Sequence, residues 1–114
     1  MTAILQNWIG GKWQDAAAEK REPVMNPATG ETIAEVPLSG GEDVNRAVAA
    51  AKEAFEEWRR VPVPRRARIM FKYQQLLTEH WDELARLITT ENGKSLNEAR
   101  GEVLRGIECV EFAA

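Results

Sequence analysis

The sequence predicts a mixed α/β fold in which a short strand region, residues 1–38, precedes a helical region, residues 39–114. In the first region, short apolar stretches are separated by turns that contain glycine and proline, which is typical of strands. From Ser39 onward, apolar residues recur every three or four positions, which is the period of an amphipathic helix. Two or three short strands cannot form a stable sheet alone, so we expect residues outside this chain to complete it.

The strand region is expected to begin with a β-hairpin over residues 4–14. Gly10 and Gly11 supply the positive φ angles that a two-residue hairpin turn requires. Residues 15–22 are polar and are interpreted as a connector, and residues 23–25 are expected to be extended. The sequence therefore places the first reversal of the chain at the glycine pair.

A turn is predicted at Asn26–Gly30, because the asparagine side chain can bond its own backbone and Pro27 fixes φ at the second turn position. A strand is expected to follow over residues 31–38. Pro37 cannot donate a hydrogen bond to a neighbouring strand. This strand is therefore expected either to lie at a sheet edge or to end there.

About four helices are expected in the second region. Ser39 to Glu42 has the spacing of a capping box and opens the first helix, which continues to Trp58. Residues 61–64 contain two prolines and end that helix, and Pro64 suits the first turn of a second helix that runs to about Leu77.

A join at Thr78 or His80 is expected to separate the second helix from a third, which ends at Asn92-Gly93 because glycine readily adopts a left-handed terminal conformation. A second capping box, Ser95 to Glu98, opens the fourth helix. The residues expected on the buried faces of the four helices are, in order, Val44, Ala47, Val48, Ala51, Phe55 and Trp58; Ala67, Met70, Phe71, Gln74 and Leu77; Trp81, Leu84, Ala85, Leu87 and Ile88; and Ala99, Val103, Ile107, Val110 and Ala114.

Composition excludes several classes of function. The net charge of −3 argues against nucleic acid or an anionic membrane as a partner. Cys109 is the single cysteine and His80 the single histidine, so no internal disulfide is possible and no metal site is expected. The chain has no long apolar run and no secretory signal pattern, and a cytoplasmic location is therefore expected.

Most candidate catalytic residues have a simpler interpretation. The carboxylates lack a spacing that implies pairing, and His80 is interpreted as a cap or a surface residue. A nucleophilic cysteine needs a nearby base, and Cys109 lies in a helix interior of a chain with a single histidine, so it is interpreted as a packing residue rather than a nucleophile. The carboxylates considered are Glu42, Asp43, Glu53 and Glu79.

The densest basic run is interpreted as a solvated or ion-paired surface, because neither a glycine-rich phosphate loop nor interleaved aromatic residues accompany it. Basic side chains in a first helical turn oppose the helix dipole, which predicts acidic neighbours. The run consists of Arg59, Arg60, Arg65, Arg66 and Arg68.

Arg105 is the strongest candidate for a binding residue. It lies on the face of the fourth helix opposite the predicted buried stripe, between Gly101 and Gly106. A glycine inside a helix costs about 1 kcal/mol relative to alanine, so a second surface is expected to need the space. The planar guanidinium binds carboxylates in a bidentate manner, which predicts a carboxylate ligand. The alternative is a surface arginine paired with Glu102 or Glu98.

Several segments, taken together, resemble the amino-terminal part of the NAD(P)-dependent aldehyde dehydrogenase superfamily. They are "NWIGGKW", "NPATGETIAEVPLSGGEDVNRAVAAAKEAFEEW" and "ENGK", in that order along the chain. A narrower resemblance, to the CoA-acylating methylmalonate-semialdehyde dehydrogenases, lies in "VPVPRRARIMFKYQQLL", "LITTENGKSLNEARGEVLRGIE" and "VEFAA". The resemblance covers essentially the whole chain.

The resemblance implies an NAD-dependent oxidation of methylmalonate or malonate semialdehyde that yields propionyl-CoA or acetyl-CoA. It implies that residues 1–114 are the amino-terminal segment of the coenzyme-binding domain, inactive alone. The catalytic cysteine, the cofactor-binding residues and the oligomerisation arm would belong to later sequence, so this chain is expected to hold no catalytic, cofactor-binding or metal-binding residue. The full-length enzyme is expected to be a homo-oligomer, and the absence of a helix stop signal before Ala114 agrees with a fragment.

The same resemblance places Arg105 in the wall of the substrate tunnel, where it would meet the carboxylate of a semialdehyde acid. Two other interpretations remain open. In the first, the chain comes from another semialdehyde dehydrogenase, which releases a free acid. In the second, it is a non-catalytic helical module that binds a protein partner.

Overall fold

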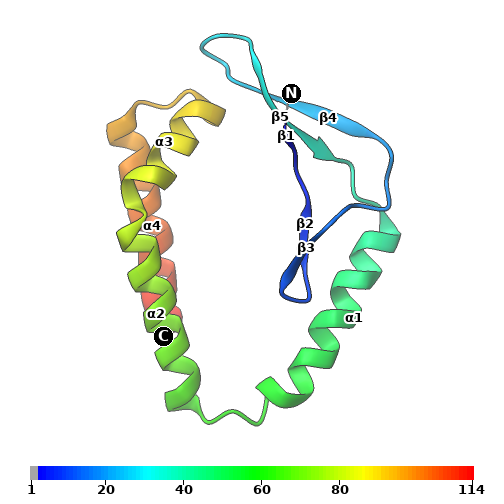
Figure 1. Cartoon of the computed structure of the whole chain (residues 1–114). Helices are drawn as coiled ribbons and strands as arrows, with labels where there is room; N and C mark the ends of the chain where they lie inside the picture. The colour runs from blue at the N-terminus through cyan, green and yellow to red at the C-terminus, as the bar shows by residue number, and fades with distance from the viewer. Residues whose placement is uncertain (1–2) are drawn as a thin grey trace. The chain divides into compact units, whose positions relative to one another are not determined.

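The computed structural model describes residues 3–114 of the chain (Figure 1). Its contacts divide the chain into two compact units. The first comprises the residues up to Asn26 together with Gly30–Arg60, and the second comprises Pro27–Thr29 and Val61–Ala114. Among the described residues, no helix is long and apolar enough to cross a membrane.

Within residues 3–114, five strands are followed by four helices, and this order of strands before helices agrees with the predicted fold class. The strands are β1 (Ala3–Ile4), β2 (Asn7–Ile9), β3 (Lys12–Gln14), β4 (Arg21–Met25) and β5 (Thr32–Pro37). The helices are α1 (Gly41–Trp58), α2 (Val63–Glu79), α3 (Trp81–Asn92) and α4 (Leu96–Ala113). All strands and α1 belong to the first unit, and α2, α3 and α4 belong to the second.

The predicted hairpin is confirmed, with narrower bounds than expected. Strands β2 and β3 are antiparallel and place Trp8 opposite Trp13, whose rings meet edge to face with centroids 4.9 Å apart. Gly10 and Gly11 join them with φ angles of 62° and 77°, in the region that the turn demands. The expectation that Ile4 belongs to this hairpin is wrong, because Ile4 pairs with a strand of the other sheet.

The three-stranded sheet has the order β1-β5-β4. Strand β1 runs parallel to β5, with Ala3 opposite Ala34, and β4 runs antiparallel to β5 on its other side. The strand that ends at Pro37 is therefore central, and the expectation of an edge position is wrong, whereas the expected end at Pro37 is confirmed. A proline is tolerated because it is the last residue of the strand.

The predicted turn between β4 and β5 is confirmed. The backbone N–H of Gly30 donates to the carbonyl oxygen of Asn26 at 2.8 Å, and the N–H of Asn26 donates to the carbonyl oxygen of Glu31 at 2.9 Å. Gly30 has a φ of 74°, which glycine adopts at little cost. The turn therefore closes through backbone bonds in both directions.

Helix α1 begins differently from the prediction. Its N-cap is Gly40, and the Ser39 side chain instead accepts a hydrogen bond from Nδ2 of Asn7 at 2.9 Å. Asp43, three residues after the cap, accepts the backbone N–H of Gly40 at 3.2 Å. The predicted capping box from Ser39 is therefore wrong, because Ser39 bonds across to β2 and a carboxylate supplies the reciprocal half of the cap.

Most of the apolar face expected to be buried on α1 is exposed. Within its unit the helix contacts strand β2, and a Cβ at Gly10 would lie 3.9 Å from that of Ala50. The small side chain of Ala50 lies at this contact, whereas the large side chains of the stripe are exposed to solvent. The exposed large residues of the predicted stripe are Val44, Val48, Phe55 and Trp58.

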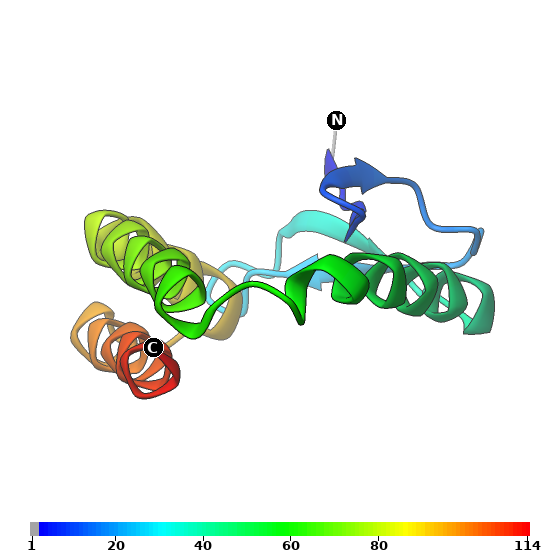
Figure 2. The same cartoon turned by 90° about the horizontal axis from the view of Figure 1, so that it is seen from below.

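The core of the second unit forms where α4 lies alongside α2 and α3 (Figures 1 and 2). The predicted buried stripe of α4 is confirmed, since its central members are fully or almost fully buried and its last two are half-buried. The buried cluster consists of Ala85, Ala99, Val103 and Ile107, with Leu77, Trp81, Leu84, Ile88 and Leu96 packed around it.

Two residues expected in this core face outward instead. Phe71 is 58% exposed and Leu87 is 53% exposed, whereas their neighbours Met70 and Ile88 are half-buried. Adjacent positions on a helix lie about 100° apart, so only one of each apolar pair can point at the same partner. The periodic pattern alone did not show which one does.

The predicted end of α3 and the predicted start of α4 are confirmed. Gly93 closes α3 with a φ of 80°, and the Ser95 hydroxyl accepts the backbone N–H of Glu98 at the start of α4. His80 is at once the C-cap of α2 and the residue that opens α3. These local signals fix the loop between α3 and α4 on both sides.

Candidate functional site

Arg105 lies on the exposed face of α4, opposite the buried stripe, as the sequence predicted. It lines a surface hollow at the start of this helix. The loop between α3 and α4 contributes one lysine to the hollow, and α4 contributes the other residues that line it. The lining residues are Lys94, Glu98, Gly101, Glu102 and Arg105.

The acidic residues of this hollow are engaged with partners other than Arg105. Nζ of Lys94 lies 2.6 Å from Oε2 of Glu102, and the Ser95 hydroxyl donates to Oε2 of Glu98 at 2.9 Å. Among residues 3–114, Arg105 forms no hydrogen bond or ion pair through its side chain. The alternative in which Arg105 pairs with Glu102 or Glu98 is therefore not what the structure shows.

The space beside Arg105 is open. A Cβ built on Gly101 or on Gly106 would meet no heavy atom within 4 Å, apart from the glycine's own surroundings in the helix. No described residue accounts for the absence of a side chain at these two positions. Gly101 shares the hollow with Arg105, and a guanidinium in such an open hollow has the chemistry to bind a planar anion such as a carboxylate.

Cys109 and His80 contribute nothing to this hollow. Cys109 is a free thiol on the exposed side of α4, so within residues 3–114 it is not the packing residue that the sequence predicted. It is two residues from buried Ile107, which places it about 200° around the helix. His80 is exposed, and its Nδ1 lies 2.7 Å from Oε2 of Glu83, as suits the predicted surface residue at a helix join.

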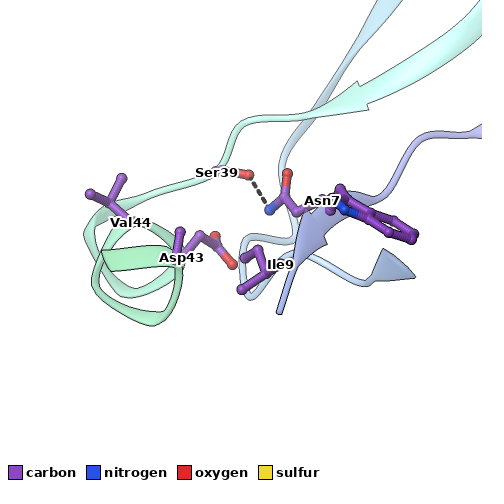
Figure 3. Close-up of a pocket in the computed structure, with 7 residues that line it drawn as sticks. Asn7, Ile9, Ser39, Asp43 and Val44 are labelled. Carbon is purple, nitrogen blue, oxygen red and sulfur yellow. Dashed lines mark hydrogen bonds between the residues drawn. The ribbon is translucent and has the colours of Figure 1, made fainter. Parts of the chain in front are cut away.

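Asp43 is a buried polar residue whose role the sequence reasoning missed (Figure 3). Its side chain is only 3% exposed, and it accepts the backbone N–H of Ala17 at 2.9 Å, the N–H of Gly40 and a guanidinium N–H of Arg46. These contacts tie the connector before β4 to the first turn of α1. The available signal was an acidic residue in the first helical turn after two glycines, but only the contact with Ala17 shows its purpose.

The same contacts lower the pKa of Asp43. The N–H of Ala17 makes the largest contribution, and the hydrogen bond from Arg46 acts in the same direction, because both stabilise the charged carboxylate. All of these donors belong to the chain itself. Asp43 is therefore a structural carboxylate in the first unit rather than a candidate acid or base.

This pKa shift predicts a pH dependence of stability. Because the folded pKa of Asp43 lies below the ordinary value of 3.8, the unfolded chain binds the proton more readily, and the free energy of unfolding should fall as the pH drops from that value through the folded pKa. Urea denaturation at a series of acidic pH values should show a shallower pH dependence in Asp43→Asn than in the unsubstituted chain. Equal slopes in both proteins would contradict the assignment.

The arginine run forms no second site in the described part of the chain. Its side chains make no ion pair among residues 3–114, so the acidic neighbours expected for them are not found there. Arg66 is half-buried, and its Nε has no hydrogen-bond partner. Within the described residues, no cluster of histidine, cysteine and carboxylate side chains could hold a metal ion.

Comparison with known proteins identifies the family to which the chain belongs. The aldehyde dehydrogenase family profile matches residues 13–114. The chain is 69% identical, over 96% of its own length and 23% of the relative's, to malonate-semialdehyde dehydrogenase 1 of Geobacillus thermodenitrificans. A putative methylmalonate-semialdehyde dehydrogenase of Sinorhizobium meliloti, solved in complex with NAD, matches 98% of this chain and 23% of its own, with a TM-score of 0.94 and 37% identity.

The methylmalonate-semialdehyde dehydrogenase of Oceanimonas doudoroffii is similarly close, with a TM-score of 0.90 and 42% identity over 99% of this chain and 23% of its own. The chain thus spans about a quarter of the length of these relatives. Its short strands and four helices match the amino-terminal part of the aldehyde dehydrogenase fold, which confirms the predicted resemblance. The chain belongs to the aldehyde dehydrogenase family.

Proposed function

We propose that this chain is part of an enzyme that oxidises malonate semialdehyde or methylmalonate semialdehyde, and that Arg105 binds the carboxylate of the substrate. The observation that carries the proposal is the unpaired guanidinium of Arg105 in an open hollow whose two acidic side chains are engaged elsewhere. The names of relatives up to 69% identical support the substrate class.

The chemistry of the substrate suits such a residue. Malonate semialdehyde carries an aldehyde at one end and a carboxylate at the other. An arginine that binds the carboxylate through two parallel N–H donors would orient the aldehyde end, which a single point charge does less well. Gly101, which lines the same hollow as Arg105, leaves room for the ligand there.

We further propose NAD as the hydride acceptor and CoA as the acyl acceptor, in a cytoplasmic homo-oligomer. NAD is supported by the complex solved for the Sinorhizobium meliloti relative. Among the described residues, the glycines with positive φ lie in the hairpin, a β-turn and a helix terminus rather than in a loop from a strand to a helix. The proposal assigns both groups to regions that the relatives have beyond the matched quarter.

The proposal is tested with Arg105→Leu in an enzyme of full family length that carries this segment. A charge-assisted hydrogen-bonded contact is worth about 1.5–3 kcal/mol, so kcat/KM for malonate semialdehyde should fall roughly 10-fold to 150-fold. The value for propanal, which lacks the carboxylate, should change little. Arg68→Leu is the matched control, because Arg68 is another exposed arginine of the same unit.

Equal losses on both aldehydes would contradict the assignment of Arg105 to the carboxylate. Product analysis with and without CoA tests the remaining part of the proposal. Formation of the thioester with CoA, together with much slower turnover without it, supports acylation, and release of the free acid at the same rate with and without CoA contradicts it.

A further inference from the structure

We propose that Lys94 is a positioning residue for carboxylate recognition, because it holds Glu102 away from Arg105 and so keeps the guanidinium free for substrate. This inference rests on the proposed role of Arg105. It concerns three side chains that line one hollow: a lysine from the loop between α3 and α4, and a glutamate and an arginine from α4.

The spacing on α4 favours a pair that the structure does not contain. Glu102 and Arg105 are three residues apart on the helix, and side chains at this spacing are neighbours that readily form ion pairs. In the structure, Oε2 of Glu102 instead contacts Nζ of Lys94 at 2.6 Å. Lys94 therefore binds one of the acidic side chains that could otherwise pair with Arg105.

The loop that carries Lys94 is fixed at both ends. Gly93 precedes it in the left-handed conformation that closes α3, and Ser95 follows it as the N-cap of α4. The backbone on both sides of Lys94 is therefore held in place, and the contact with Glu102 restrains the Lys94 side chain. The Ser95 hydroxyl holds the other acidic residue, Glu98, in a similar way.

Release of Glu102 would matter because its carboxylate and the substrate carboxylate need the same donors. A Glu102 side chain paired with Arg105 would have to be displaced before substrate binds, which raises KM without altering the chemical step. The Lys94 and Glu102 side chains are 40% and 48% exposed, and exposed pairs are weak. The expected effect is therefore a shift of a few fold rather than a loss of activity.

The experiment compares four forms of the family-length enzyme: unsubstituted, Lys94→Met, Glu102→Gln and the double variant. Lys94→Met should raise KM for malonate semialdehyde about twofold to fivefold, with kcat and the kinetics on propanal unchanged. The double variant should restore KM, because an amide is a poor competitor for a guanidinium. Lys94→Arg, which keeps the pair with Glu102, should also behave as the unsubstituted enzyme does.

Each other outcome has a defined meaning. If KM rises equally in Lys94→Met and in the double variant, Lys94 acts directly by its charge and the inference fails. If KM rises for propanal as well, Lys94 supports the structure only, and the inference fails too. If Arg105→Leu discriminates between the two aldehydes while Lys94→Met does not, this inference fails and the proposed function stands. If Arg105→Leu does not discriminate, the proposed role of Arg105 fails, and this inference fails with it.

Discussion

Replacement of Ile107 by alanine is expected to destabilise the second unit by about 2–5 kcal/mol, which is the range for truncating a large buried aliphatic side chain. Ile107 is only 3% exposed and belongs to the cluster in which α4 meets its neighbours. The loss should be large because two other members of this cluster, Ala85 and Ala99, have no side-chain atoms beyond Cβ with which to fill the cavity. Urea denaturation of the 114-residue chain, followed by helical circular dichroism, measures the change.

Leu104→Ala provides the comparison for this substitution. Leu104 lies on the same helix and is 39% exposed, so its truncation removes less buried surface and should cost roughly 1 kcal/mol or less. Both substitutions introduce alanine, which has the highest helix propensity, so propensity does not explain a difference between them. Equal losses in the two variants would show that the face of α4 assigned to the core is wrong.

Gly93→Ala is expected to destabilise the second unit by about 2–5 kcal/mol for two separate reasons. The φ of 80° at this position costs a residue with a Cβ roughly 1–2 kcal/mol. The added Cβ would also lie 2.9 Å from Cγ of Pro27, in the turn that packs against the loop between α3 and α4, and overpacking typically costs about 1–3 kcal/mol. The same denaturation measurement applies.

Gly101→Ala is the matched control, because the chemical change is identical and the surroundings differ. Gly101 lies inside α4, and an added Cβ meets nothing within 4 Å. Alanine there should stabilise the isolated chain by about 0.5–1 kcal/mol through helix propensity and a less flexible unfolded chain. Changes of the same sign at Gly93 and Gly101 would contradict the roles assigned to the two glycines.

Arg105 shows how far sequence reasoning reached at the candidate site. The helical period was enough to place it opposite Val103 and Ile107, because side-chain direction on a regular helix follows from residue number alone. The period did not show that Lys94 holds Glu102, because Lys94 lies outside the helix and its direction depends on the loop. That Arg105 has no side-chain partner among the described residues thus follows only from the arrangement of its neighbours in the structure.

Signals that act within a few residues predicted most of the local structure. Three such features were predicted correctly: the glycine pair of the hairpin, the terminator Gly93 and the N-cap Ser95. The glycines are determined by backbone angles, and the cap is determined by a hydrogen bond between residues three positions apart. Such preferences do not depend on residues that are distant in the sequence. The sequence was therefore sufficient for the four helices and for most of their ends.

Features that join distant segments needed the folded chain. Strand β1 pairs with β5 across about thirty residues, Ser39 bonds to Asn7 instead of capping its own helix, and Asp43 binds the backbone of Ala17. A polar group or a strand edge can form hydrogen bonds with several different segments. Tertiary packing determines which of these segments lies close enough to pair. Local chemistry therefore set the elements, whereas competition among non-local contacts set their pairing, the buried carboxylate and the free guanidinium.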